Sequence, residues 1–145
     1  MRSAATLSTV IFSMTLLANC ASTAPHWGRQ KETPVAHNAV FVESGTASYY
    51  SKAFVNKKTA NGERYKPEIF TTAHPSLPFG TLLLVKRKNN GKYVIVRVND
   101  RGPFIKGRIV DLSLAAAKKL GMITQGRCDV DIYKIPSDSR LAQNL

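Results

Sequence analysis

The chain has 145 residues, enough for one domain, and carries 21 Lys and Arg against 9 Asp and Glu, a formal net charge of +12. Such a charge attracts polyanions, of which nucleic acid, acidic lipid and anionic cell-wall polymer are the common kinds. The sequence shows neither a recognition-helix pattern nor a series of stacking aromatics, so we predict no nucleic acid partner. A solvated basic surface would look much the same, because the lysine and arginine clusters fall in separate segments.

The first 19 residues predict a secretory signal peptide. Met1-Arg2 is a short basic start, and residues 4–17 form a mostly apolar stretch, too short to span a bilayer but suited to a signal h-region. The motif Leu17-Ala18-Asn19-Cys20 then resembles the bacterial lipobox, in which cleavage leaves a cysteine that is lipidated. Asn19 departs from the usual Gly, Ala or Ser, so cleavage by the ordinary signal peptidase stays open as the alternative.

Either route predicts an exported protein. Lipid on Cys20 would hold it at a membrane, and Ala21 is not the Asp that is associated with inner-membrane retention in enteric bacteria. We therefore predict a lipoprotein at the periplasmic face of the outer membrane, with a soluble periplasmic protein as the alternative.

The remainder divides into three parts. Residues 20–43 are rich in Ser, Thr, Pro, Ala and His and predict a flexible tether. Residues 44–135 predict one small domain, and residues 136–145 a disordered polar tail.

Cysteine and histidine usage predicts neither a disulfide nor a metal site. Cys128 lies in an alternating pattern typical of a strand, so its thiol is expected to pack inward rather than pair with Cys20. His26, His37 and His74 are scattered without metal-ligand spacing. We expect no metal and no other cofactor.

Short strands and turns dominate the predicted domain. Strand patterns cover residues 46–50, 81–88, 93–98, 108–111 and 129–135. Asn89-Asn90-Gly91 predicts a hairpin turn, because Asn-Gly accommodates positive φ. One helix is expected at residues 114–120, with Ser113 as its N-cap and Gly121 just after its end. This pattern favours a small closed β-barrel but leaves its topology open.

An acidic residue lies just after the third of these predicted strands. Asp100 comes two residues after Val98, on a turn that Gly102 and Pro103 stiffen. A carboxylate at a strand end is well placed for proton transfer, because the scaffold sets its position. Taken alone, the segment fits equally well an Asx-type turn closed by its own aspartate.

Five segments in order resemble one known family. They are Gly45-Thr46-Ala47-Ser48-Tyr49-Tyr50, Lys58-Thr59-Ala60-Asn61-Gly62-Glu63, Thr72-Ala73-His74-Pro75-Ser76-Leu77-Pro78-Phe79-Gly80-Thr81, Asn99-Asp100-Arg101-Gly102-Pro103-Phe104 and Asp111-Leu112-Ser113-Leu114-Ala115-Ala116-Ala117. Together they resemble the rare lipoprotein A (RlpA-like) family of lytic transglycosylases of the bacterial division septum. The resemblance implies an all-β fold, a small six-stranded double-psi β-barrel with one short α-helix. The chain departs from the pattern at Tyr49, where Trp is usual, at Ser51 for Gly and at Thr72 for Ala.

The resemblance implies that Glu63, His74 and Asp100 line a catalytic groove. Asp100 is the expected acid/base, since related barrels carry their catalytic acid at a comparable aspartate. Glu63 would favour the protonated form of Asp100 by like charge, or orient the sugar, and His74 would hydrogen-bond a carboxylate or the sugar. Each has a plainer interpretation: Glu63 as an exposed turn residue and His74 as a local hydrogen-bonding residue.

Four further residues are candidates for substrate contact. Tyr49 and Tyr50 could stack on sugar rings, although in a strand one of them must face the core. Phe79 would edge the groove. Arg101 is expected to point away from Asp100, toward Asp111 or backbone carbonyls, because pairing with Asp100 would weaken its role as an acid.

The resemblance therefore implies an enzyme that cleaves the MurNAc–GlcNAc bond of peptidoglycan glycan strands without water, leaving 1,6-anhydro-MurNAc ends. It would act in wall remodelling or septal daughter-cell separation, with division proteins as candidate partners. One alternative is a non-catalytic, expansin-like peptidoglycan-binding module. The other is an inverting glycan hydrolase, which needs a water between two carboxyl groups roughly 6.5–9.5 Å apart.

Overall fold

A computed structural model describes residues 38–137 of the chain. The predicted signal peptide, Cys20, most of the tether at residues 20–43 and all but two residues of the tail at 136–145 lie outside that range and stay predictions. Between residues 38 and 137, no helix has the length and apolar character needed to cross a membrane.

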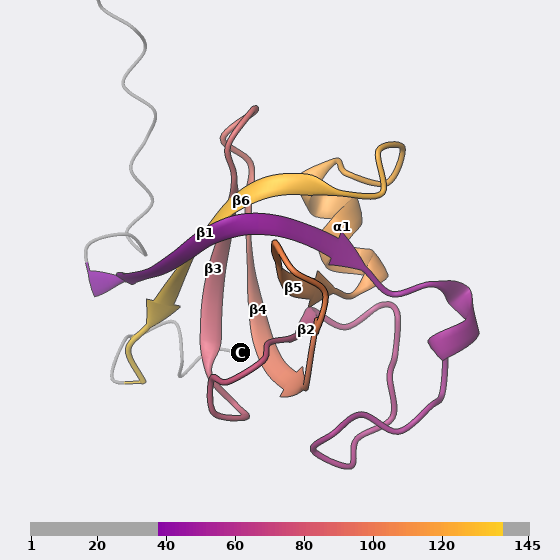
Figure 1. The fold of residues 1–145 in the computed structure, drawn as a ribbon. Helices are drawn as coiled ribbons and strands as arrows, with labels where there is room; N and C mark the ends of the chain where they lie inside the picture. Colours follow the sequence, from indigo (N-terminus) through magenta and orange to yellow (C-terminus); the bar gives the residue numbers. More distant parts are fainter. Residues whose placement is uncertain (1–37, 138–145) are drawn as a thin grey trace, which may run out of the picture. The chain divides into compact units, whose positions relative to one another are not determined.

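Six strands close into a barrel, with one short α-helix packed against it (Figure 1). The strands are β1 (Val40–Tyr49), β2 (Thr71–Ala73), β3 (Leu82–Arg87), β4 (Tyr93–Asp100), β5 (Arg108–Leu112) and β6 (Cys128–Ile135). Their order around the barrel is β1-β5-β2-β4-β3-β6. The β1/β5 and β2/β4 pairs are parallel and the other four are antiparallel, so the chain crosses over itself instead of running up and down. This arrangement confirms the six-stranded barrel.

Two strands differ from the sequence prediction. β2, which the pattern did not show, has only three residues, but its Thr72 and Ala73 pair with both β4 and β5 and close the barrel. β1 begins at Val40, so residues 40–43, assigned to the tether, belong to the sheet. They are ordered by pairing with the end of β6, where the rings of Phe41 and Tyr133 meet edge to face at 5.6 Å.

Inward-facing side chains of the strands form the core, as the alternation along each strand requires. The fully buried members include Leu83, Val85, Val94, Val96, Val98, Val110, Leu112, Val130 and Ile132. Cys128 also points inward, with its sulfur 3.7 Å from that of Met122, and burial raises the pKa of its thiol. The thiol therefore packs as a small apolar group, as predicted.

The helix α1 (Leu114–Leu120) has the predicted bounds and caps. Ser113 Oγ accepts a hydrogen bond from the Ala116 amide at 3.3 Å, and Gly121 adopts the left-handed conformation with φ of 67°. The buried Arg87 donates to the Gly121 carbonyl at 2.7 Å, which satisfies the end of the helix from inside the protein.

Strand register aligns residues of four strands side by side. Ser48 on β1 pairs with Asp111 on β5, Asp111 pairs with Ala73 on β2, and Ala73 pairs with Asp100 at the end of β4. The barrel therefore places the last residue of β4 close to the segments that leave β1 and β2.

Candidate active site

The carboxylate of Asp100 accepts hydrogen bonds on both oxygens. Oδ1 accepts from the backbone amides of Ala60 and Arg101, each at 2.8 Å, and Oδ2 accepts from the Tyr50 hydroxyl at 2.7 Å. Two of the three donors come from segments distant in sequence, so the fold, together with the local turn at Arg101, fixes the position of this carboxylate. The side chain remains partly exposed, as a group that meets substrate must be.

Contacts with the barrel and with neighbouring aromatic rings hold Tyr50 in place. Its amide donates to the Leu112 carbonyl at 3.0 Å, and its ring lies 4.8 Å from that of the buried Tyr65 and 5.6 Å from that of Phe54. Burial and the hydrogen bond to Asp100 raise the pKa of the Tyr50 phenol well above its usual value. The hydroxyl therefore keeps its proton at physiological pH.

The segment 59–63 is a turn docked onto the end of β4. Asn61 Oδ1 accepts from the Thr59 hydroxyl at 2.7 Å and the Glu63 amide at 3.1 Å, and Gly62 takes a φ of 90° that other residues rarely adopt. The Asn61 amide donates to the Asn99 carbonyl at 3.2 Å. This turn delivers the Ala60 amide to Asp100, which explains the Thr-Ala-Asn-Gly-Glu pattern in physical terms.

Glu63 faces a cation. Arg97 donates to Oε1 at 2.8 Å and to Oε2 at 2.9 Å, and Asn99 Nδ2 donates to Oε2 at 3.0 Å. The bonds from Arg97 and then Asn99 lower the pKa of Glu63 to about 2. With its charge balanced by Arg97, Glu63 is better suited to orient the turn or the sugar than to act on Asp100 by like charge.

His74 lies beneath the surface, with 2% of the residue exposed. Its Nδ1 accepts from the amides of Ser76 and Leu77 at 3.2 and 3.1 Å, and its Nε2 is 3.0 Å from Glu43 Oε1. The imidazole thus binds a carboxylate, one of the two partners expected for it. The pKa of His74 lies below its usual value, and burial of the ring is the largest cause.

Arg101 points toward backbone carbonyls, one of the two directions expected from the sequence. Its Nη1 donates to the Leu77 carbonyl at 2.8 Å, and its guanidinium lies 3.8 Å from the centre of the Phe79 ring, which is 40% exposed. Asp111 instead pairs with Arg108 and accepts from Ser48. Within residues 38–137, no basic side chain forms an ion pair with Asp100.

Tyr49 and Tyr50 divide as strand alternation requires. Tyr49 packs against the core and its hydroxyl donates to the Ile123 carbonyl at 3.2 Å, away from Asp100. Both tyrosines nevertheless line one open pocket of about 650 Å³, together with Ser51, Lys52, Val55, Tyr65, Pro67, Leu114, Ile123 and Gly126. Asp100 does not line this pocket, and Tyr50 is the lining residue that hydrogen-bonds to it.

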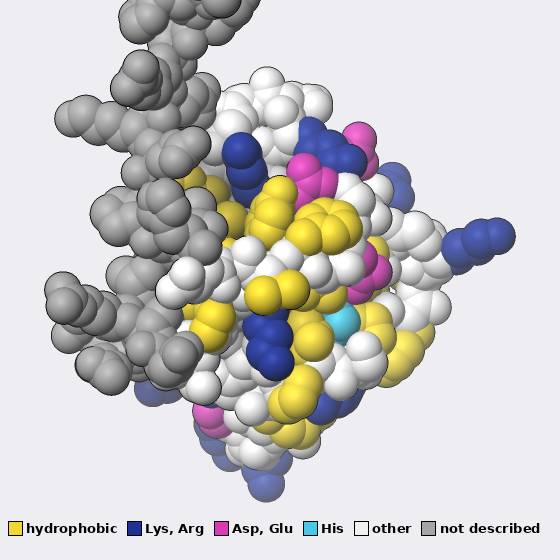
Figure 2. All heavy atoms as spheres, turned by 90° about the vertical axis from the view of Figure 1, so that its left-hand side faces the viewer, with side chains coloured by type: hydrophobic (Ala, Val, Ile, Leu, Met, Phe, Trp, Pro, Cys, Tyr) yellow, Lys and Arg dark blue, Asp and Glu magenta, His cyan; other side chains and the backbone are white. Residues whose placement is uncertain are grey.

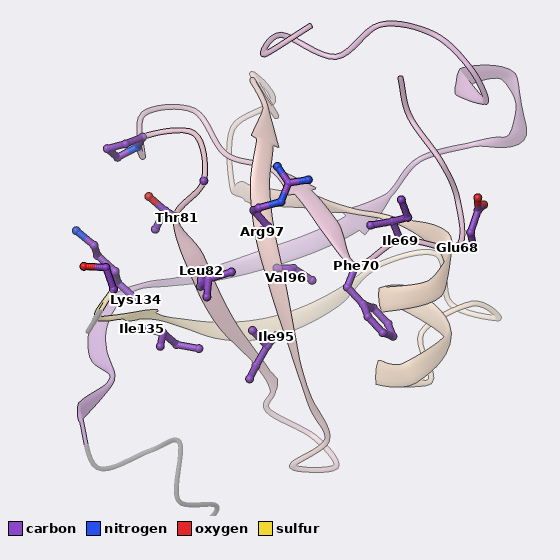
Figure 3. Close-up of a pocket in the computed structure, with 13 residues that line it drawn as sticks. Glu68, Ile69, Phe70, Thr81, Leu82, Ile95, Val96, Arg97, Lys134 and Ile135 are labelled. Carbon is purple, nitrogen blue, oxygen red and sulfur yellow. The ribbon is translucent and has the colours of Figure 1, made fainter. Parts of the chain in front are cut away.

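A second pocket of about 820 Å³ lies on the outer face of β3, β4 and β6 (Figure 3). Its wall is largely apolar and includes Phe70, Leu82, Ile95 and Ile135, with Arg97 at its edge. Asp100 does not line it. Because Arg97 lines this pocket and also binds Glu63, the pocket lies next to Glu63 rather than next to the candidate acid.

The donor set at Asp100 determines which oxygen can react. Backbone amides can only donate, so a proton on Oδ1 would face two N–H groups. A tyrosine hydroxyl can donate or accept, so it can turn its proton away when Oδ2 is protonated. The arrangement therefore favours Oδ2 as the oxygen that carries and transfers a proton.

Solved structures share the fold at low sequence identity. A Streptomyces papain inhibitor superposes with a TM-score of 0.53 at 21% identity, over 66% of this chain and 97% of its own. The apo expansin of Clavibacter michiganensis gives 0.53 at 23% identity, over 66% of this chain and 51% of its own. These likenesses concern the fold alone, and the class of protein is the double-psi β-barrel.

Sequence comparison goes further. The family model described as lytic transglycolase matches residues 42–132. The endolytic peptidoglycan transglycosylase RlpA of Neisseria meningitidis (strain MC58) is 48% identical over 106 residues, 73% of this chain and 44% of that protein. The protein of that name from Pasteurella multocida is 46% identical over 98 residues, 68% of this chain and 33% of its own. The chain belongs to the lytic transglycolase family of RlpA proteins, and it spans less than half the length of these curated relatives.

Several residues of the site carry no signal in the sequence. Arg97 reads as an ordinary strand residue, Ala60 contributes only its amide, and Glu43 lies in a segment assigned to the tether. Each acquires its role through a contact distant in sequence, from 31 residues for Glu43–His74 to 40 for Ala60–Asp100. Of these residues, only Arg97 could have been suggested by the sequence, because the alternation along β4 places it on the same face of the strand as Asn99.

The Glu63–Arg97 pair predicts a specific pH dependence of stability. Because the folded-state pKa of Glu63 is about 2, below its usual 4.5, its contribution is present above pH 4.5 and is lost as the pH falls toward 2. Glu63→Gln should therefore lower the free energy of unfolding at pH 6 by roughly 0.2–1 kcal/mol, the range for exposed pairs, and by less near pH 2. Urea denaturation at both pH values measures this. Glu68→Gln, at another exposed glutamate, is the control, and a Glu63→Gln effect that grows toward pH 2 would contradict the assignment.

Proposed function

We propose that this chain cleaves the glycan strands of peptidoglycan as a lytic transglycosylase, in wall remodelling or daughter-cell separation. The observation that carries the proposal is the Asp100 carboxylate, fixed by two amides and by a hydroxyl that can both donate and accept. The names of the relatives support the substrate class. Division proteins as partners rest on the resemblance of the motifs alone.

In the proposed reaction, protonated Asp100 gives its proton to the oxygen of the bond between an N-acetylmuramyl and an N-acetylglucosaminyl residue as the C1–O bond breaks. The C6 hydroxyl oxygen of the same muramyl residue then bonds to C1, and its proton passes to ionised Asp100. One residue thus acts as acid and then as base, no water is consumed, and the new end is a 1,6-anhydro sugar.

Aromatic side chains from two separate segments pack on the groups that donate to Asp100. Tyr50, whose hydroxyl donates to Asp100, packs on Phe54, and Phe79 packs on the guanidinium of Arg101, whose amide donates to Asp100. Phe54 and Phe79 are 46% and 40% exposed, so each can offer a ring face or edge to a sugar. A glycan strand bound at Asp100 would therefore have aromatic groups from both segments available to contact its sugars.

The nature of the products tests this function most directly. Purified protein is incubated with sacculi and the soluble products are identified by mass spectrometry. Anhydro-muropeptides are expected. Products with reducing ends would favour the inverting hydrolase, and binding without any product would favour the wall-binding module.

Asp100→Asn is expected to abolish cleavage while folding and sacculus binding persist. The amide keeps the size of the side chain but removes the titrating proton, and general acid–base catalysis contributes about 10²–10⁴-fold. The measurement is the rate of anhydro-muropeptide release beside the circular dichroism spectrum and a sacculus pull-down. Full activity in this variant would remove Asp100 from the acid role and make Glu63 the candidate.

Tyr50→Phe is expected to lower kcat by about 10–100-fold, because a hydrogen bond to a charged group contributes about 1.5–3 kcal/mol. The phenyl ring keeps the contacts with Tyr65 and Phe54, so KM should change little. Tyr49→Phe is a matched control, since the Tyr49 hydroxyl contacts the Ile123 carbonyl and not Asp100. Equal rates for the two variants would contradict the role given to Tyr50.

We also propose that Cys20 is lipidated and holds the chain at the periplasmic face of the outer membrane. The motif Leu17-Ala18-Asn19-Cys20 after an apolar stretch supports this. Radiolabelled palmitate should be incorporated by the parent and by Cys128→Ala, whose thiol is buried, but not by Cys20→Ala. Label that persists in Cys20→Ala would contradict lipidation at Cys20, and a parent that takes up no label would favour ordinary signal cleavage and a soluble protein.

A further inference from the structure

The contact between Glu43 and His74 joins two segments that are not neighbours in the sheet. β1 pairs with β5 only from Thr46 onward, so the earlier residues of β1 have no strand on that side. Glu43 lies in this part of β1, and its carboxylate meets the imidazole of His74, which follows β2. In Figure 2 the histidine of this face (cyan) shows only a small area among hydrophobic side chains, with acidic side chains nearby.

The three hydrogen bonds of His74 define one tautomer of its neutral imidazole ring. Nδ1 accepts from two backbone amides, those of Ser76 and Leu77, so it carries no proton. The neutral ring must then carry its proton on Nε2, which donates to Glu43 Oε1 at 3.0 Å. Both nitrogens are engaged within the protein, and neither is free to exchange a proton with a substrate.

The loop that Nδ1 holds leads directly to Asp100. The Leu77 carbonyl accepts from Arg101 Nη1 at 2.8 Å, and the Arg101 guanidinium stacks on Phe79. The Arg101 amide in turn donates to Asp100 Oδ1, and the His74 amide donates to the Asp100 carbonyl at 3.2 Å. A shift of residues 76–79 would therefore move both the Phe79 ring and the donors of Asp100.

We infer that Glu43 is a positioning residue for the reaction at Asp100: its carboxylate accepts from Nε2–H and anchors the ring of His74 against the two amides, so that the ring holds the 74–79 loop, Phe79 and Arg101 in place. The inference rests on the proposed function and assigns His74 a role through the loop and not through its own proton. The side chain of Glu43 is 41% exposed, and among residues 38–137 its carboxylate forms a hydrogen bond or ion pair only with His74. Its effect on catalysis is therefore expected to pass through His74.

Three variants separate charge from hydrogen bonding. Glu43→Gln keeps an oxygen that can accept from Nε2, Glu43→Ala removes it, and Glu68→Ala is the control at an exposed glutamate outside the network. On soluble glycan strands we expect Glu43→Ala to lower kcat/KM about tenfold, because the Nε2–H of the buried His74 loses its acceptor and the ring no longer holds the loop in place. Glu43→Gln should remain within about threefold of the parent, because the bond to a neutral acceptor is retained.

A direct readout of the ring accompanies the kinetics. With His26 and His37 replaced by Asn, the remaining imidazole belongs to His74, and its nitrogen chemical shifts report which nitrogen carries the proton. The parent and Glu43→Gln should show the Nε2–H form. In Glu43→Ala the ring has lost its anchor and can turn away from the amides of Ser76 and Leu77, so a mixture of forms is expected. A change in global stability alone would not alter which nitrogen of His74 carries the proton in the folded protein.

An unchanged Nε2–H form in Glu43→Ala, or a kcat/KM equal to that of Glu68→Ala, would overturn the inference. If Glu43→Ala does not fold, the comparison rests on Glu43→Gln, and a rate loss as large as that of Asp100→Asn would equally overturn it. If the parent itself releases no anhydro-muropeptides, the proposed function fails. The ring form and the affinity for glycan strands then still decide whether Glu43 positions the loop.

Discussion

The hydrogen bonds that converge on Asp100 are the constraint on which the rest of the site depends. A carboxylate at the end of a strand would ordinarily turn with its own loop, but here a hydroxyl and an amide from distant segments hold it. Each donor requires its own support: Tyr50 needs β1 and Tyr65, and the Ala60 amide needs the Asn61 turn. The barrel topology is therefore part of the chemistry, since only the β1-β5-β2-β4 order brings these segments to one carboxylate.

Three arginines close to the site bind groups other than the carboxylate of Asp100. Arg97 pairs with Glu63, Arg108 pairs with Asp111, and the guanidinium of Arg101 donates to the carbonyls of the 74–77 segment. A guanidinium beside Asp100 would favour the ionised carboxylate and oppose its use as an acid. The net charge of +12 can thus attract an anionic polymer over long range while the carboxylate of the candidate acid accepts from neutral donors.

Local signals were sufficient for some parts of the structure and insufficient for others. Both ends of the helix were predicted correctly, because Ser113 and Gly121, the residues directly before and after it, set where it begins and ends. Asp100 could be singled out because a strand pattern and a turn flank it. The three residues of β2 lack the length for a pattern, and the partners of Glu63, His74 and Asp100 depend on register between segments 31 to 50 residues apart.

The fold alone does not determine the activity, because a papain inhibitor and an expansin share it at 21% and 23% identity. Any activity must therefore come from the groups placed on the barrel, which here include an acid without a basic ion-pair partner among residues 38–137, a hydroxyl able to accept as well as donate, and aromatic rings packed on two of its donors. Of these, the hydroxyl matters most for the choice between cleavage and binding. A carboxylate needs only donors to bind a sugar, whereas a group that gives and recovers a proton needs a neighbour that remains satisfied in both states, and Tyr50 is that neighbour.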